Sequence, residues 1–343
     1  MSARKMKAQV LRRIANVEEG PLELMELLIP RLKGREILVK VSVCGICHTE
    51  LDEIEGRVMP KLPVILGHQV VGKVVERGSA AERYDIGDRV GVAWIYSACG
   101  ECYYCRTGNE NLCDKFMGTG CHADGGYAEY MVVSEDFAYP IPDRFTDSQA
   151  APLLCAGAIG YRALKLTGMR DGEVLGLYGY GASAHIVHQV VKYKFPKSRV
   201  YVFTRRKGDA PSELAKKFGA DWVGVTGETP PEKLNRVIDT TPSSSVVKEA
   251  LKNLDKGGRL VVNVIRKETL IPELEYAEHL WHEKEIKSVA NITRKDVQEF
   301  LPLAAEISIT PEITEFKFEE ANQALISLRQ GKYRGAGVLR IQK

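Results

Sequence analysis

Four closely spaced cysteines place the strongest constraint on how this chain can fold. Their spacing is Cys99-x2-Cys102-x2-Cys105-x7-Cys113, in a stretch with little hydrophobic periodicity. Four thiolates in a tetrahedral array leave no ligand position open, so the spacing predicts a closed, structural zinc site. A loop this irregular buries little apolar surface, and the metal would supply most of its order. The alternatives are free buried thiols, an iron–sulfur cluster or a thioredoxin-like redox pair. The redox pair fits poorly, because the motif does not open a helix after a strand.

The composition is that of an ordinary soluble globular protein. The 343 residues allow two domains, and 44% are hydrophobic and 27% charged. The formal charge of +3 becomes +1 when six thiolates (−6) and two zinc ions (+4) are counted, so neither nucleic acid nor a membrane surface is expected as a partner. No apolar run approaches the length that spans a bilayer, and no apolar signal segment follows the basic residues 1–7. A cytoplasmic protein is therefore expected.

The first part of the chain has the pattern of a β-rich domain. Alternating or continuous apolar runs predict strands at 6–18, 35–44, 67–75, 89–93 and 125–133, and the same style returns at 337–341 after a predicted helix at 295–306. We expect residues 1–155 and 290–343 to form this domain, with the four-cysteine loop as a lobe on it.

The middle of the chain alternates strands and helices. Predicted strands are 173–179, 199–204, 221–225, 235–239 and 258–264, with helices at 182–194, 211–218 and 243–254 between them. This alternation is typical of an α/β domain with a doubly wound parallel sheet, here residues 156–289.

A glycine-rich turn in this domain indicates a dinucleotide site. Gly179-Tyr180-Gly181-Ala182-Ser183-Ala184 follows a predicted strand and opens a predicted helix. Gly179, Gly181 and the small Ala182 would permit a tight turn and let a pyrophosphate approach the helix N-terminus. The pattern alone also fits any tight strand–helix turn. His185 and His188, on the helix that follows, are expected to be structural.

The next strand end bears on cofactor choice. NAD-specific sites carry an acidic residue there, whereas this chain has Thr204-Arg205-Arg206-Lys207. Guanidinium groups match a 2′-phosphate, so NADP is preferred over NAD. The alternative is that both arginines face solvent or stack on adenine. Thr240, which follows another predicted strand, is expected either to contact the cofactor or to cap the strand end.

A second metal site is suggested by three scattered residues. They are Cys47 in CGICHTE, His68 in GHQ and Cys155 in PLLCAG. Two thiolates and one imidazole would leave a fourth position for water or substrate, as catalytic zinc requires. Each residue is weak evidence alone, because a cysteine in an apolar run is typical of a core and a lone histidine is commonly structural.

In combination the motifs resemble a known family. The segments CGICHTE, GHQVVGKVVE, GDRVGV, the four-cysteine lobe, DGGYAEY and PLLCAG resemble the zinc-dependent alcohol dehydrogenases of the medium-chain dehydrogenase/reductase superfamily, over nearly the whole chain. The resemblance implies a GroES-like catalytic domain, a Rossmann cofactor domain and a homodimer or homotetramer. It implies hydride transfer between a primary or secondary alcohol and a nicotinamide cofactor. The alternatives are a polyol or carbonyl reductase of the same superfamily, or a zinc-binding homologue without dehydrogenase activity.

The resemblance also implies roles for individual residues. Cys47 rather than Cys44 would bind catalytic zinc, together with His68 and Cys155. Zinc lowers the pKa of a bound alcohol, and Thr49 would take the alcohol's proton. His48 would lie near the cofactor pyrophosphate, and Glu50 would hold the outer nitrogen of His68. Trp94 would form a wall of the substrate pocket, and a position in the core is the alternative for it.

Two positions depart from the family pattern. The family usually has Glu where Gln69 stands, and a neutral amide there would leave the site more positive and lower the pKa of the alcohol. Many members have a proton-relaying His where Asp52 stands. Asp52 could relay the proton through water or could be a solvated surface residue.

Overall fold

The fold consists of two units. The computed structural model describes residues 4–333 and 335–342, so the first three residues of the basic N-terminal segment lie outside the described part. Unit 1 comprises residues 1–155, 292–305 and 310–343, and unit 2 comprises residues 156–291 and 306–309. No helix within the described residues combines the length and apolar character that crossing a membrane requires.

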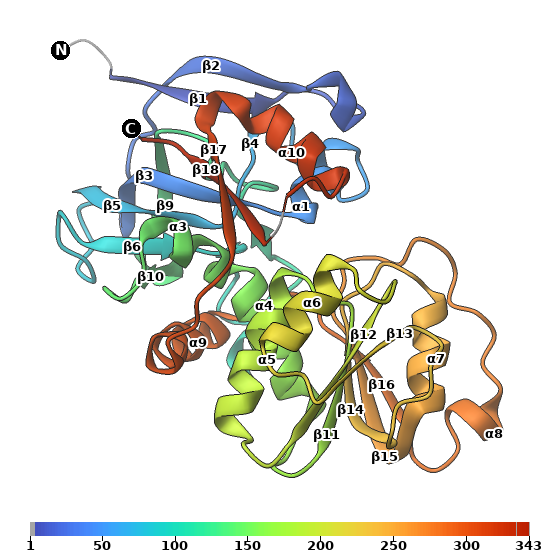
Figure 1. Cartoon of the computed structure of the whole chain (residues 1–343). Helices are drawn as coiled ribbons and strands as arrows, with labels where there is room; N and C mark the ends of the chain where they lie inside the picture. The colour runs from blue at the N-terminus through green and yellow to red at the C-terminus, as the bar shows by residue number, and fades with distance from the viewer. Residues whose placement is uncertain (1–3, 334, 343) are drawn as a thin grey trace. The chain divides into compact units, whose positions relative to one another are not determined.

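Unit 1 is built on β-sheets. A seven-stranded sheet has the order β10-β6-β5-β3-β18-β17, with β9 also paired to β3, and a second sheet has the order β2-β1-β4 (Figure 1). Its strands are β1 (Lys5–Leu11), β2 (Leu22–Leu28), β3 (Glu36–Ile46), β4 (Val64–Ile65), β5 (Val70–Arg77), β6 (Arg89–Val92), β7 (Ile95–Ser97), β8 (Met117–Gly118), β9 (Tyr130–Ser134), β10 (Ala138–Pro140), β17 (Ile313–Lys317) and β18 (Ala336–Arg340). Its helices include α1 (His48–Ile54), α2 (Tyr103–Arg106), α3 (Asp147–Ala150) and α10 (Ala321–Arg329), and α9 (Arg294–Ile307) begins in this unit.

Strand β3 organises unit 1. Ile37, Leu38, Val39 and Val41 are fully buried, whereas Lys40 is exposed, so this strand is a largely continuous apolar run that is covered on both faces. The strand pairs antiparallel with β5, β9 and β18. The end of β3 therefore lies at the centre of the sheet, where neighbouring strands can bring distant residues close to it.

Unit 2 is a six-stranded parallel sheet in the order β13-β12-β11-β14-β15-β16. Its strands are β11 (Val174–Tyr178), β12 (Arg199–Thr204), β13 (Trp222–Val225), β14 (Leu234–Asp239), β15 (Leu254–Val262) and β16 (Glu285–Ser288), and its helices are α4 (Ala156–Thr167), α5 (Ala182–Lys194), α6 (Ala210–Lys217), α7 (Ser245–Asn253) and α8 (Tyr276–His279). Figure 1 shows α4 and α5 on one side of this sheet and α7 on the other. The strand order and the two helical layers confirm the predicted doubly wound fold.

Several element boundaries differ from the predictions. The predicted strand at 6–18 is wrong beyond Leu11, because the chain leaves the sheet, passes a left-handed Gly20 (φ 63°) and returns as β2. Strand β15 begins at Leu254, four residues before its predicted start, because Leu254 already pairs with β14. Helix α4 and strand β16 were not predicted. Glycines weaken the helical signal of α4, and β16 is exposed along its whole length, so it has no apolar alternation.

Candidate functional site

The three candidate ligands of the second metal site come together in unit 1. Cys47 follows β3, His68 precedes β5, and Cys155 follows a 3-10 helix at Ala151–Leu154. The sulfur atoms of Cys47 and Cys155 are 4.0 Å apart, and His68 Nε2 is 3.3 Å from Cys155 Sγ. Ligand atoms around a tetrahedral zinc ion lie about 3.6–3.8 Å apart, given Zn–S and Zn–N distances of about 2.3 and 2.0 Å. The donor set therefore fits a zinc ion that keeps one ligand position open.

Glu50 connects two of these ligands. Its Oε2 accepts a hydrogen bond from the Cys47 backbone N–H at 2.8 Å, and its Oε1 lies 2.7 Å from His68 Nδ1. Glu50 and His68 are almost completely buried. A carboxylate on the outer nitrogen orients an imidazole with its other nitrogen toward a metal. Burial raises the pKa of Glu50, an effect that the adjacent His68 opposes.

Cys44 and Cys47 occupy different environments although they are close in sequence. Cys44 is fully buried, and a Cβ added to Gly67 or Gly126 would lie 2.8 or 3.0 Å from its sulfur. Burial raises the pKa of the Cys44 thiol well above its usual value, so this cysteine is a neutral core residue. Hydrogen bonding from Cys155, with a further contribution from His68, instead lowers the pKa of Cys47 well below its usual value.

The remaining predicted residues around this site differ in exposure. Thr49 is buried, and its hydroxyl oxygen lies 3.6 Å from Cys47 Sγ, so helix α1 presents it beside the candidate ligand. His48 is exposed to solvent. Trp94 is buried with its ring edge-on to His68 at 5.1 Å between centroids, and it stacks on Phe116. Trp94 therefore covers one side of the imidazole.

The two positions that depart from the family pattern are both buried. Asp52 forms an ion pair with Arg57, and its side chain is 7% exposed, so the expectation of a solvated surface residue is wrong. Gln69 lies against Gly45, where an added Cβ would be 2.8 Å from the Gln69 side chain. Glycine at position 45 therefore makes room for the amide beside the candidate ligand His68.

Glu53 is a buried carboxyl that was not predicted. It lies one helical turn after Glu50 and is completely buried. Burial and the nearby Glu50 raise the pKa of Glu53 well above its usual value. The i, i+3 spacing of the two glutamates on α1 was the available signal, because residues three apart share a helix face.

The four-cysteine lobe forms a second ligand cluster in unit 1. Cys99 Sγ lies 3.8 Å from Cys105 Sγ and 3.5 Å from Cys113 Sγ, and all four sulfur atoms lie within 4.8 Å of one another. Backbone N–H groups donate to three of the sulfurs, as those of Cys102, Cys105 and Lys115 do. Four sulfurs at these separations fit a closed tetrahedral zinc site.

A partly buried ion pair holds the lobe to another part of unit 1. Glu110 accepts hydrogen bonds from the backbone N–H and the Nε of Arg294, at 2.9 and 3.1 Å. The Arg294 guanidinium also lies over the ring of Phe137, 4.8 Å from its centroid. This connection spans 184 residues of sequence, so no local pattern could have predicted it.

The glycine-rich turn of unit 2 has the form of a dinucleotide-binding loop. Gly179 has φ 81°, and an added Cβ would lie 2.7 Å from Thr240 Oγ1, so only glycine fits. Gly181, just before α5 begins at Ala182, faces open space, because no atom lies within 4 Å of an added Cβ. Open space at a helix N-terminus at the carboxyl edge of a parallel sheet fits a pyrophosphate.

The residues at the ends of the neighbouring strands β12 and β14 differ in exposure and in their partners. Thr204 is buried, and its hydroxyl donates to the Arg206 carbonyl, so it supports the turn. Arg205 and Arg206 are exposed, whereas Lys207 forms an ion pair with Glu228 at 2.6 Å. The Thr240 hydroxyl donates to the Tyr178 carbonyl at 3.0 Å.

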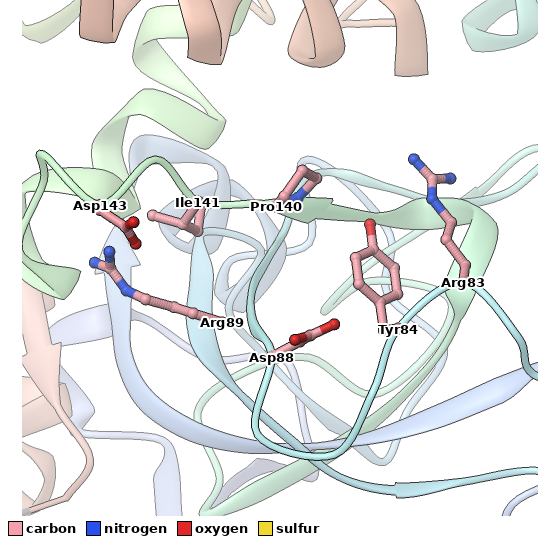
Figure 2. A pocket seen from close by; sticks show the side chains of 7 residues that line it. All are labelled: Arg83, Tyr84, Asp88, Arg89, Pro140, Ile141 and Asp143. Atoms are coloured by element: carbon pink, nitrogen blue, oxygen red, sulfur yellow. The ribbon is translucent and has the colours of Figure 1, made fainter.

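A surface hollow of about 440 Å³ lies elsewhere on unit 1, as Figure 2 shows. It is lined by Arg83, Tyr84, Asp88, Arg89, Pro140, Ile141 and Asp143. Arg89 is already held by Asp147 at 2.7 Å, and Tyr84 donates to the Ala138 carbonyl. None of the predicted site residues lines this hollow, so it takes no part in the chemistry discussed below.

Known proteins resemble this chain over its whole length. A family model for the alcohol dehydrogenase GroES-like domain matches residues 33–143. The probable alcohol dehydrogenase AdhA of Mycobacterium tuberculosis is 42% identical, covering 98% of this chain and 97% of that protein, and an alcohol dehydrogenase of Geobacillus stearothermophilus is 36% identical, covering 98% and 100%. The solved cinnamyl alcohol dehydrogenase of Sorghum bicolor has a TM-score of 0.86 at 28% identity and covers 98% of each chain.

This chain belongs to the zinc-dependent alcohol dehydrogenases of the medium-chain dehydrogenase/reductase superfamily. It is an NAD(P)-dependent oxidoreductase that interconverts alcohols and carbonyl compounds, which confirms the predicted class and activity. Its substrates are small-molecule alcohols and aldehydes, and it uses zinc and a nicotinamide cofactor. A zinc-binding protein without dehydrogenase activity is not favoured.

Proposed function

We propose that unit 1 is the catalytic domain of this dehydrogenase, that unit 2 binds the nicotinamide cofactor, and that each chain holds two zinc ions. The single observation that carries this proposal is the convergence of Cys47, His68 and Cys155, with Glu50 on the outer nitrogen of His68. Three protein ligands with one open position are typical of catalytic zinc, and the four-cysteine lobe has the ligands of a closed structural site.

The proposed mechanism assigns a task to each residue around the first zinc. Zinc held there would act as a Lewis acid and lower the pKa of the alcohol, and the nicotinamide would accept the hydride. The alcohol carbon would give its hydride to the nicotinamide, and the Thr49 hydroxyl would accept the proton of the alcohol oxygen while passing its own proton to water, so that it stays neutral. Glu50 keeps His68 in the orientation that binds the metal. Trp94 limits the width of the space beside His68.

The route of the proton beyond Thr49 is proposed not to run through Asp52. The Arg57 guanidinium forms an ion pair with this carboxylate and occupies one of its oxygens. His48, which is exposed, is proposed to lie near the cofactor pyrophosphate as a hydrogen-bond donor.

Metal analysis combined with a cofactor-linked assay tests the proposed function. We expect two zinc ions per chain and turnover of members of a panel of alcohols, aldehydes, ketones and polyols with NADPH or NADH. A preparation that holds both zinc ions but turns over nothing in this panel would contradict the proposal. Turnover restricted to polyols would instead favour a polyol dehydrogenase of the same superfamily.

We propose that NADP is preferred over NAD, with Arg205 and Arg206 binding the 2′-phosphate. Both side chains are exposed, and neither guanidinium group is paired with a carboxylate within the described residues, so both can meet a phosphate. Replacing either by alanine is expected to raise the KM for NADPH by about 10- to 100-fold and to leave the KM for NADH nearly unchanged, because hydrogen bonds to charged groups contribute about 1.5–3 kcal/mol.

Lys207→Ala is the matched control, because Lys207 is already paired with Glu228. The KM values for both cofactors should change by less than about twofold in this variant. A wild-type enzyme that strongly prefers NADH, or Arg variants in which NADPH and NADH respond alike, would contradict the assignment.

We also propose a cytoplasmic homodimer or homotetramer. Strand β16 is the edge of its sheet, and exposed apolar side chains lie on it and just before it: Tyr276 (62%), Trp281 (53%) and Ile286 (41%). An exposed strand edge beside apolar surface is suited to pairing with the same strand of a second copy. The free cysteines suit a reducing compartment.

Ile286→Lys is expected to shift the protein toward monomer, because a charge would be buried where two β16 strands pair. Light scattering after size-exclusion chromatography measures the mass. Ile86→Lys is the control, since Ile86 is a 68% exposed isoleucine in unit 1 and its change should leave the mass unaltered. An Ile286→Lys protein with the wild-type oligomeric mass would exclude this edge as the interface.

A further inference from the structure

A tyrosine lies between the two glycines of the dinucleotide loop and points into the interior of unit 2. Tyr180 is 3% exposed, and its hydroxyl oxygen is 2.6 Å from Nδ1 of His188. His188 is completely buried on α5, eight residues further along the chain. The two rings meet edge to face at 5.9 Å between centroids. A buried hydrogen bond therefore connects the loop to α5, the helix that begins directly after the loop.

Both partners of this hydrogen bond are uncharged groups. Burial lowers the pKa of His188 to about 4, and the charges of Lys192 and His185 act in the same direction, against Asp221. Burial also raises the pKa of Tyr180 above its usual value. Both groups are neutral at pH 7, so no charge assists this hydrogen bond, and the tautomer of His188 sets which of the two groups donates.

A second histidine holds the next residue of the loop. His185 Nδ1 lies 3.0 Å from the carbonyl oxygen of Gly181, and since a carbonyl only accepts, this nitrogen carries the proton. The two histidines lie three residues apart on α5, so they share one face of the helix. Each holds a different residue of the loop, His188 the side chain of Tyr180 and His185 the backbone of Gly181.

We propose that Tyr180 and His188 form a positioning pair that holds the glycine-rich loop in the conformation that receives the cofactor's pyrophosphate. Glycine on both sides of Tyr180 gives the loop backbone many alternative conformations. If only a fraction of the molecules has the binding-competent conformation, the apparent Kd equals the intrinsic Kd divided by that fraction. The buried hydrogen bond raises the competent fraction before the cofactor arrives. This inference rests on the proposed dinucleotide-binding function of unit 2.

Tyr180→Phe removes only the hydroxyl and is the main test. We expect the Kd for NADPH and for NADH, measured by fluorescence titration without substrate, to rise about fivefold for both cofactors, since one neutral hydrogen bond contributes about 1 kcal/mol. The kcat at saturating cofactor should stay within about twofold of wild type. An equal effect on both cofactors distinguishes the loop from the arginines, whose loss should affect NADPH alone.

Tyr178→Phe is the matched control. Tyr178 is also fully buried and hydrogen-bonded, but its hydroxyl accepts from Asn253 at 2.9 Å and its ring stacks on Phe203, away from the loop. This variant should lose similar thermal stability and keep wild-type Kd values. If Tyr180→Phe binds both cofactors as tightly as Tyr178→Phe does, the positioning role is overturned.

Variants of the histidine provide a second line of evidence. His188→Asn keeps an acceptor near the position of Nδ1 and should retain cofactor affinity, whereas His188→Leu should lose about as much as Tyr180→Phe. The double variant Tyr180→Phe/His188→Leu should be no weaker than either single one, because both changes break the same bond. Fully additive losses would contradict a shared role.

Hydrogen exchange on the cofactor-free protein separates this inference from the proposed function. The amides of residues 180–184 should exchange about fivefold faster in Tyr180→Phe than in Tyr178→Phe. If the wild-type chain bound neither cofactor, the proposed function would fail, and faster exchange would still show that the pair holds the loop. Unchanged exchange in Tyr180→Phe would overturn the inference whether or not the chain binds a cofactor.

Discussion

Replacing Cys47 by alanine is expected to remove one of two zinc ions per chain and to lower kcat/KM by at least about 10³-fold. Only His68 and Cys155 would remain as ligands, and two ligands do not hold zinc firmly in a site built for three. The chemical step would lose the Lewis acid that brings the pKa of the substrate hydroxyl toward neutrality, a term that contributes several kcal/mol. Metal analysis and steady-state kinetics on the same preparation measure both effects.

Cys44→Ala is the control for this experiment. Cys44 is a buried thiol three residues earlier on β3, and its sulfur lies in the core against Gly67 and Gly126. This variant should keep both zinc ions and most of its activity, with a modest loss of stability from the small cavity. A Cys47→Ala protein that kept two zinc ions and near wild-type kinetics would contradict the ligand assignment.

Replacing Cys105 by serine is expected to remove the other zinc ion and to lower the thermal midpoint by about 10 °C or more. Structural zinc supplies folding free energy directly, and for a chain of this size about 1 kcal/mol corresponds to a few degrees. The lobe would also release its hold on Arg294, which Glu110 now anchors through two hydrogen bonds. Calorimetry and metal analysis measure the change, and hydrogen exchange near residues 110 and 294 locates it.

The control for the lobe is Cys121→Ser. Cys121 is fully buried but belongs to neither ligand cluster, so both zinc ions should remain and the thermal midpoint should fall less than in Cys105→Ser. If Cys105→Ser kept both metals, the lobe would not be a zinc site. If it lost both at once, the two clusters would depend on one another, and the separate roles proposed for them would be wrong.

The features that could be predicted from the sequence are those whose residues lie within one short stretch of chain. The four lobe cysteines lie within one loop, so their spacing already limits the ligand geometry. The strand–glycine–helix turn at residues 174–194 and the strand alternation of unit 2 are likewise local. Strand β16 was not predicted, because all four of its residues are exposed and its sequence therefore has no alternation of apolar and polar residues.

The environments of single residues could not be predicted in the same way. Asp52 and Glu53 are adjacent in sequence and both acidic, yet Asp52 is paired with Arg57, whereas burial raises the pKa of Glu53 well above its usual value. His188 is fully buried, in agreement with the expected structural role, but the sequence did not show that its partner is the tyrosine of the glycine-rich loop. The exposure and the hydrogen-bond partners of a helical residue depend on the segments that pack against the helix. A local sequence pattern does not identify those segments.

The sequence by itself determined the class of the fold, the closed four-thiolate lobe and the glycine-rich turn, because each depends on residues within a few turns of chain. Only the tertiary structure decided which of the scattered cysteines and histidines share a site. Cys47 and Cys155 are 108 residues apart, and they meet with His68 because the register of β3 against β5 pairs Cys44 with Val70. Strand register depends on the packing of the whole sheet, so a local pattern cannot encode it.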